Sequence, residues 1–218
     1  MPPVARRGRP RRGTSTLTRE AIVLAAIAMA EEEGLDAVAM RGLARRLGVD
    51  PMSLYHHVDN RDALLNAIAE HILAALELPT PTGELRADVR AIAHAFRTAA
   101  LRHPNCATLV LTRQLASTAA LAPTNAALGV LRAAGFTPER AVHGMRAVLA
   151  YLVGSLLREA EAGPSFSGAN LGGVSERFGV LRDSGQEYVA EAATHLATCD
   201  HLTEFDFGLD LLITALEG

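Results

Sequence analysis

Apolar residues recur at helical spacing near the start of the chain and predict two helices there. The first runs from about residue 18 to residue 33, with Thr18 as its capping side chain and Gly34 as its stop. A second, shorter apolar stripe predicts a helix over 40–47. That helix ends at Gly48, because glycine takes the left-handed conformation that a tight turn needs.

Two further helices follow before the first clear break in the pattern. Pro51 suits the first turn of a helix that reaches about residue 57, since its missing N–H costs nothing there. Asn60 caps the next helix, whose apolar face continues to Leu76. The chain is then interrupted at Pro79, Pro81 and Gly83. We therefore expect one domain over 18–78 and a second over 84–218.

The second domain is also expected to be helical. Apolar stripes separated by proline and glycine predict helices at about 84–102, 105–118, 122–134, 138–162, 187–198 and 203–217. The segment 163–186 is rich in glycine and serine, and we expect a long loop there with at most one short turn. Alanine and leucine are abundant and β-branched runs are scarce, so the fold class is predicted to be all-α.

The segment between residues 40 and 58 has the arrangement of a helix-turn-helix. Ala44 is small enough for two helices to cross closely, and Gly48 makes the turn between them. Such a unit places its second helix in the major groove of DNA. A helical hairpin in any bundle can show the same turn, but the flanking arginines favour DNA binding. The side chains that can reach phosphates or base edges are Arg41, Pro51, Met52, Ser53, Tyr55, His56, His57 and Arg61.

Charge is unevenly distributed along the chain, whose net charge is −3. Residues 1–61 hold ten arginines and seven acidic residues, whereas the remainder holds eleven arginines and seventeen acidic residues. A basic end on an acidic body suits a protein that binds a polyanion through that end. An incidental basic tail is the simpler explanation of the charge alone.

Residues 1–17 have almost no apolar content and are expected to form a disordered arm. Arginines alternate there with glycine and proline, as in extended segments that insert into the narrow minor groove of A·T-rich DNA. The candidate contacts are Arg7, Arg9 and Arg11. The alternative is a solvated basic tail that only raises nonspecific affinity.

The sequence gives no support to several other classes of protein. Cys106 and Cys199 are isolated, and the adjacent His56 and His57 point in different directions on a helix, so we expect no metal and no cofactor. No nucleophile, P-loop or dinucleotide motif indicates an enzyme. No apolar run approaches the roughly 18 residues that a membrane span needs, and no apolar segment follows the basic N-terminus. We expect a cytoplasmic protein.

The N-terminal motifs together resemble the DNA-binding domain of the TetR family of bacterial regulators. The matching stretches are Leu17-Thr-Arg-Glu-Ala-Ile, Glu33-Gly-Leu-Asp, Met40-Arg-x-Leu-Ala-x-x-Leu-Gly-Val, Leu54-Tyr-x-His-Val and Asn60-Arg-x-x-Leu-Leu. The resemblance implies that the third helix is the recognition helix and that the eight residues named above contact bases or phosphates. The family usually has Thr or Ser where this chain has Ala39. The missing cap costs about 1 kcal/mol and puts one backbone contact in doubt.

The second domain resembles the C-terminal domain of tetracycline repressors. The matching stretches are Gly135-Phe-Thr-Pro-Glu, Ala147-Val-x-x-Tyr-x-x-Gly and Phe205-x-x-Gly-Leu-Asp-Leu-Leu. This resemblance implies a small-molecule pocket between the middle helices. The positions matching the drug–magnesium ligands of those repressors hold none of the needed groups, so the pocket is expected to be mostly apolar. Its lining is predicted as Ile92, Phe96, Val110 and Ala150, with two candidate polar anchors, Arg113 and Arg146.

The resemblance also implies a homodimer formed by the helices at 138–162 and 203–217. In the first of these helices, apolar or small residues alternate by four and three, as in a seam for a partner helix: Ala141, Met145, Val148, Leu152 and Ser155. Packing inside one subunit is the alternative that this pattern leaves open. A single short recognition helix makes few contacts with DNA, so we expect a two-fold dimer on a palindromic operator.

These inferences lead to one functional hypothesis and one alternative. We expect a sequence-specific transcriptional regulator, a repressor that a small apolar ligand releases from its operator. The alternative is an architectural DNA-binding protein that acts mainly through its basic arm and responds to no ligand.

Overall fold

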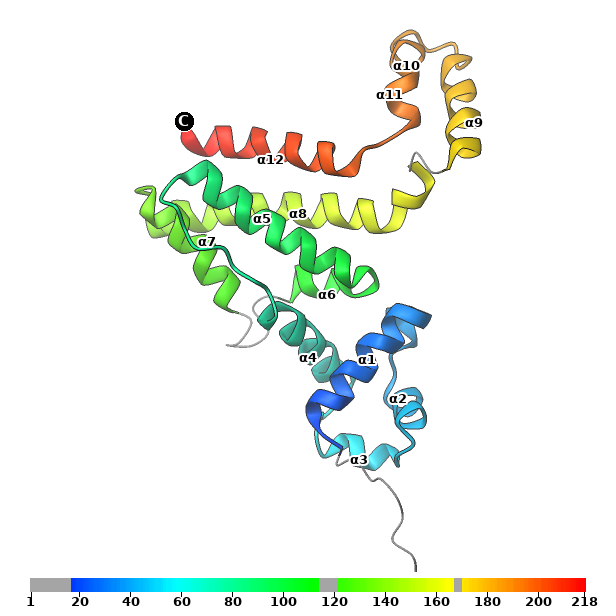
Figure 1. Cartoon of the computed structure of the whole chain (residues 1–218), viewed down its shortest axis with the longest axis vertical. Helices are drawn as coiled ribbons and strands as arrows, with labels where there is room; N and C mark the ends of the chain where they lie inside the picture. Colours follow the sequence, from blue (N-terminus) through cyan, green and yellow to red (C-terminus); the bar gives the residue numbers. More distant parts are fainter. Residues whose placement is uncertain (1–16, 114–120, 167–169) are drawn as a thin grey trace, which may run out of the picture.

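The computed structural model describes residues 17–113, 121–166 and 170–218, and these ranges are helical and contain no strand. Figure 1 shows a small group of helices at one end of the molecule and a larger group beyond it. The small group comprises α1 (Arg19–Glu33), α2 (Met40–Leu47), α3 (Pro51–Tyr55) and α4 (Arg61–Ala74). All four predicted N-terminal helices are confirmed, and the third ends two residues earlier than expected.

Side-chain caps set the starts of three of these helices. Thr18, Asp50 and Asn60 each accept a hydrogen bond from a backbone N–H in the first turn of the following helix, at 2.8–3.1 Å. Gly48 ends α2 in the left-handed region, with φ 67°. Ala39, which precedes α2, offers no capping side chain. The orphan N–H groups of α2 therefore lack the cap that α1, α3 and α4 have.

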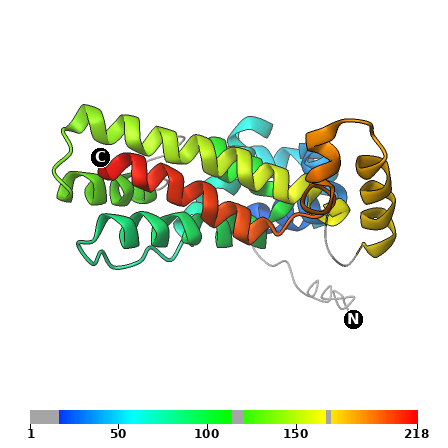
Figure 2. The ribbon, with the colours of Figure 1, turned by 90° about the horizontal axis from the view of Figure 1, so that it is seen from above.

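The larger group contains three long helices, α5, α8 and α12, and several shorter ones. Its members are α5 (Leu85–Arg102), α6 (Ala107–Thr112), α7 (Leu121–Ala133), α8 (Pro138–Phe166), α9 (Leu171–Arg182), α10 (Glu187–Glu191), α11 (Ala193–Ala197) and α12 (His201–Glu217), with a 3-10 turn, η2 (Pro104–Cys106), before α6. The helices α8 and α12 lie side by side in opposite directions, and α5 packs against both (Figures 1 and 2). The helices predicted at 84–102, 122–134, 138–162 and 203–217 are confirmed.

The loop predicted over 163–186 is wrong, because α8 continues to Phe166 and α9 occupies residues 171–182. Leu171, Val174, Phe178 and Leu181 lie on one side of α9, and Asn170 caps it through a bond from the Gly173 N–H at 3.2 Å. Each helical glycine costs roughly 1 kcal/mol relative to alanine. Packing against α11 offsets that cost, since the Arg177 guanidinium donates to the Ala197 carbonyl at 2.8 Å.

Two further boundaries differ from the prediction. The single helix expected over 187–198 is two short helices, α10 and α11, which meet at Ala192. The helix expected over 105–118 begins as η2, continues as α6 and ends at Thr112, whereas residues 114–120 lie outside the described ranges. Short apolar runs carried too little periodicity to show these breaks.

One continuous cluster of buried apolar side chains joins the two groups of helices. It runs from Ile22 and Leu54 in the N-terminal group, through Ile68 on α4 and Val110 on α6, to Phe205 on α12. Helix α4 therefore belongs to both parts of the core. Among the described helices, none is long and apolar enough to cross a membrane.

Charged side chains bind α5 to its neighbours along the edge of this core. Basic residues on one face of α5 meet acidic residues of α12 and α8, and the pairs include Arg86 with Glu217, Arg90 with Asp206, His94 with Asp206, and Arg97 with Glu159. Tyr151 on α8 adds a hydrogen bond from its hydroxyl to the Phe205 carbonyl at 2.8 Å. These contacts fix α5, α8 and α12 relative to one another.

Candidate DNA-binding surface and effector cavity

The short helix α3 presents its polar and flexible side chains to solvent. Leu54 is fully buried and fixes the helix to the domain core, which turns the neighbouring positions outward. Met52 is 64% exposed and Tyr55 is 43% exposed. The structure thus gathers six of the eight predicted contacts at one end of the molecule (Figure 1): Pro51, Met52, Ser53, Tyr55, His56 and His57. The two histidines lie in the turn after α3 rather than on the helix.

The two predicted arginines that flank this surface have different environments. Arg41 is exposed in the first turn of α2, and none of the described ion pairs includes it. Arg61 is also exposed, but its Nε donates to the Val38 carbonyl at 2.7 Å and its Nη2 to the Leu35 carbonyl at 3.1 Å. Part of the Arg61 guanidinium therefore holds the backbone that leads into α2, next to the uncapped Ala39. The predicted arm contacts Arg7, Arg9 and Arg11 lie outside the described residues.

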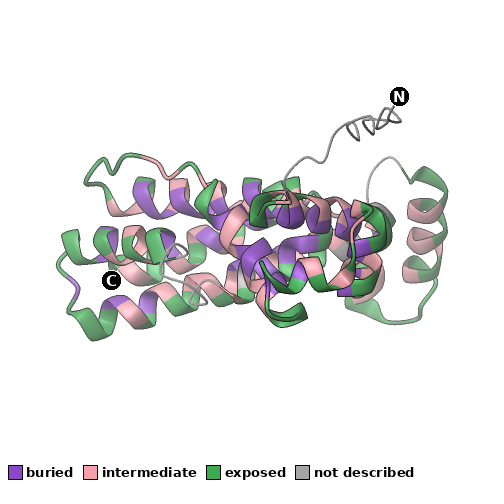
Figure 3. Ribbon diagram, turned by 90° about the horizontal axis from the view of Figure 1, so that it is seen from below, coloured by how far each residue is buried: buried purple, intermediate pink, exposed green. Residues whose placement is uncertain are grey.

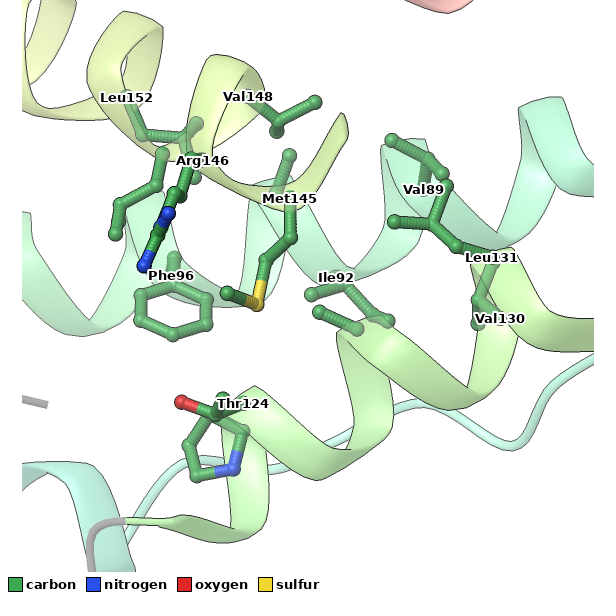
Figure 4. A pocket seen from close by; sticks show the side chains of 14 residues that line it. Val89, Ile92, Phe96, Thr124, Val130, Leu131, Met145, Arg146, Val148 and Leu152 are labelled. Atoms are coloured by element: carbon green, nitrogen blue, oxygen red, sulfur yellow. The ribbon is translucent and has the colours of Figure 1, made fainter. Parts of the chain in front are cut away.

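A cavity of about 150 Å³ lies between α5, α7 and α8 (Figure 4). Phe96 forms one wall, and Met145 reaches in from α8. Among the described residues of the lining, only Thr124 and Arg146 carry a hydroxyl or a charged group. The described residues that line it are Val89, Ile92, Ala93, Phe96, Pro123, Thr124, Ala127, Val130, Leu131, Met145, Arg146, Val148, Leu149 and Leu152. Such a cavity favours an apolar molecule with few polar groups.

The structure brings together three of the six residues predicted to line the pocket: Ile92, Phe96 and Arg146. Val110 is fully buried in α6, in the core and outside the cavity lining. Ala150 is exposed on α8, and Arg113 points to α4. The wall contributed by α7 was missing from the prediction. Its signal was the spacing of Pro123, Thr124, Ala127, Val130 and Leu131, which lie on one face of a helix.

Arg113 joins the body to the DNA-binding part of the molecule. Its guanidinium pairs with the Asp62 carboxylate at 2.9 Å and donates to the Asn66 side chain, and both partners lie on α4. Before α6, the Asn105 side chain makes a second link between the two parts, since it donates to the Glu31 carbonyl near the end of α1 at 3.1 Å. Burial and the neighbouring Glu31 carboxylate raise the pKa of the Cys106 thiol to about 12, so this junction holds a neutral thiol at physiological pH.

The seam predicted for a partner helix faces the interior of this subunit. Ala141 and Leu152 are buried, and Met145, Val148 and Leu152 line the cavity. The assignment of that face to a partner is corrected accordingly, since the apolar period marks core packing. The exposed faces of the same two helices carry other residues: Ala147, Ala150 and Gly154 on α8, and Phe207 and Leu211 on α12.

In the described part of the chain, no three His, Cys, Asp or Glu side chains gather as metal ligands. The cavity lining likewise contains no carboxylate and no imidazole. What the described lining of the cavity offers a ligand is therefore apolar surface, one hydroxyl and one guanidinium.

Two family models match separate stretches of the chain. The model of bacterial regulatory proteins of the tetR family matches residues 22–68. The model of the tetracyclin repressor-like C-terminal domain matches residues 78–218, which is more than half of the chain.

The similar proteins are regulators of the same kind. The tetracycline repressor protein class G of Vibrio anguillarum is 31% identical over 92% of this chain and 94% of its own length. The crystal structure of the TetR family protein ActR of Streptomyces coelicolor in complex with actinorhodin has a TM-score of 0.81 and 26% identity, and the match covers 93% of this chain and 96% of that one. A TetR variant of Acinetobacter baumannii in complex with minocycline has a TM-score of 0.69 and 29% identity, with 93% and 97% covered. The chain therefore belongs to the TetR family of bacterial regulatory proteins, and it is a ligand-responsive, DNA-binding transcriptional regulator.

Proposed function

We propose that this protein is a repressor that binds a palindromic operator as a homodimer and leaves it when a small, mostly apolar molecule occupies the cavity between α5, α7 and α8. The proposal rests on one observation. Helix α4 connects the exposed recognition helix to the body that contains the apolar cavity, and Arg113 binds α4 to that body. As a regulator of bacterial genes, the protein would act in the cytoplasm.

On the DNA side, α3 enters the major groove with Tyr55 and Ser53 as hydrogen-bonding groups and Met52 as an apolar contact for a thymine methyl group. Arg41 neutralises a phosphate beside the groove, and the basic arm adds minor-groove contacts through Arg7, Arg9 and Arg11. Because α3 has only five residues, one subunit makes few base contacts. Two subunits on two half-sites supply the affinity that one lacks.

The dimer interface is proposed on the exposed faces of α8 and α12. Phe207 and Leu211 are 63% and 59% exposed, which is costly for large apolar side chains in a lone subunit. The small residues Ala147, Ala150 and Gly154 on the outer face of α8 allow a helix of the second subunit to approach closely. Two copies of each helix then form a four-helix interface.

Release from the operator requires that the effector bind one conformation more tightly than the other. Helix α8 forms one wall of the cavity and also packs against α6. Arg113, which directly follows α6, forms an ion pair with Asp62 on α4. A ligand that moves these walls therefore changes the position of α4 and, with it, the separation of the two recognition helices. The complexes of ActR with actinorhodin and of A. baumannii TetR with minocycline support a small-molecule ligand for this chain.

The test is a comparison of DNA affinities by fluorescence anisotropy. The full-length protein is titrated into the DNA upstream of its own gene and into scrambled DNA, at two salt concentrations. We expect a preference of about a thousandfold or more for the operator. Equal affinities that collapse with salt would instead point to an architectural protein that binds through its arm.

The coupling is tested with Arg113→Gln and a matched control, Arg102→Gln, which removes a charge from the exposed end of α5. Both variants are expected to bind the operator in the absence of effector. With an effector found by screening, Arg113→Gln should respond less than the control. An unchanged response would show that the signal reaches α4 by another route.

A further inference from the structure

Arg146 places a positive charge at the effector cavity, and no described side chain of the lining pairs with it. Arg146 contributes a guanidinium to the cavity, and the side chains around it are aliphatic or aromatic except for the Thr124 hydroxyl. Figure 4 shows Arg146 extending from α8 toward Phe96 on the opposite wall.

Several other arginines of the same domain pair with carboxylates within the subunit. Arg86 and Arg97 on α5 pair with Glu217 and Glu159, and Arg113 pairs with Asp62. None of the ion pairs between described residues includes Arg146. Arg146 is exposed in the absence of a ligand, so water hydrates its charge.

A molecule that fills the cavity displaces part of that water. The guanidinium then loses hydrogen-bond acceptors, and the loss weakens binding unless the ligand supplies replacements. A carboxylate or similar oxyanion replaces them well, since it accepts two parallel hydrogen bonds from one guanidinium. A neutral apolar molecule supplies none, and a cation is repelled.

We propose that the effector is a compact apolar molecule with a single anionic group, which binds Arg146 while the apolar body lies against Phe96, Ile92 and Val130. This inference rests on the proposed function and adds the chemical class of the ligand. A volume of about 150 Å³ sets the size, because an apolar cavity of similar volume holds about one benzene ring. The Thr124 hydroxyl offers one further hydrogen bond to the anionic group or to a substituent.

The test measures direct binding to the full-length protein by isothermal titration calorimetry at neutral pH. The probes share one ring and differ in charge: phenylacetate, neutral phenylacetamide and the phenethylammonium cation. Anthracene carboxylate keeps the charge and enlarges the body. Each probe is titrated into the natural protein, into Arg146→Gln and into Arg140→Gln, a matched control on α8 whose guanidinium lies over the Phe136 ring and outside the cavity.

We expect phenylacetate to bind the natural protein at least tenfold more tightly than the amide or the cation, as a hydrogen-bonded charge pair implies. Arg146→Gln should abolish this preference, whereas Arg140→Gln should keep it. The inference is overturned if the amide binds as tightly as the acid, if Arg146→Gln keeps the preference, or if no one-ring probe binds. Tighter binding of anthracene carboxylate than of phenylacetate overturns the predicted size.

Operator binding is measured in parallel, which separates this inference from the proposed function. If phenylacetate binds through Arg146 but leaves the operator complex intact, the charge assignment stands and the proposed release mechanism fails. If a neutral compound alone releases the operator, the release mechanism stands and the anionic class is wrong.

Discussion

Arg61 offers a sharp test of the difference between a residue that positions the recognition helix and one that contacts DNA. Its two hydrogen bonds to the carbonyls of Val38 and Leu35 measure 2.7 and 3.1 Å. Hydrogen bonds from a charged donor contribute about 1.5–3 kcal/mol each when sheltered, but Arg61 is exposed, so about 1–2 kcal/mol in total is a fair expectation. For a chain of this size, Arg61→Gln should lower the melting temperature by about 2–8 °C.

Arg41→Gln is the matched comparison, because Arg41 has no such bonds in the described structure. It should leave the melting temperature unchanged and weaken DNA binding through a lost phosphate contact. Each phosphate contact contributes about 0.9 to the slope of log affinity against log salt, so a dimer should lose about 2. The assays are differential scanning fluorimetry and anisotropy over a salt series. The positioning role is refuted if Arg61→Gln keeps its melting temperature and loses as much salt slope as Arg41→Gln.

Three further predictions follow from the same structure. Tyr55→Ala should weaken operator binding by about 1–3 kcal/mol while affinity for scrambled DNA stays constant, because Tyr55 is exposed on α3 and contributes little to the core; competition anisotropy measures both. Phe207→Asp should shift the protein from dimer to monomer in analytical ultracentrifugation with the helical circular dichroism signal retained, and a dimer of normal affinity would place the interface elsewhere. Hydrogen bonds from the N–H and hydroxyl of Thr82 and the N–H of Gly83 lower the pKa of Asp88. Because this folded-state pKa lies below the unfolded one of about 4, the stabilising contribution is complete above that pH and disappears in more acidic solution. The free energies of unfolding in urea of the natural protein and of Asp88→Asn should therefore differ at neutral pH and become equal below about pH 4. A difference that does not change with pH would contradict the pKa argument.

The N-terminal domain was predictable because local chemistry and tertiary packing agree there. Thr18, Asn60 and Gly48 are strong start and stop signals, and the structure uses each of them as expected. The role of Arg61 was not predictable, since its partners are backbone carbonyls more than twenty residues away. Only the folded arrangement shows that an arginine beside the recognition helix also supports the uncapped start of α2.

The body was harder to predict because its helices bury apolar residues on more than one side. The period on α8 that suggested a partner helix marks the wall of the cavity and the intramolecular core, as Met145 and Leu152 show. A sequence period gives the face of a helix that is buried but not the element that buries it. Helix α9 was predicted as a loop for a different reason. None of its residues is buried (Figure 3), and its glycines are typical of a loop.

The continuous core through α4 has a consequence for how the molecule melts. The break at Pro79, Pro81 and Gly83 suggests two units, yet the buried side chains of α4 pack with both. Calorimetry should accordingly record a single heat-absorption peak whose van't Hoff and calorimetric enthalpies agree. A substitution in the cavity wall would then lower the thermal stability of the DNA-binding helices as much as that of the body. The DNA-binding segment, expressed alone, would expose apolar surface on α4 and be prone to aggregation.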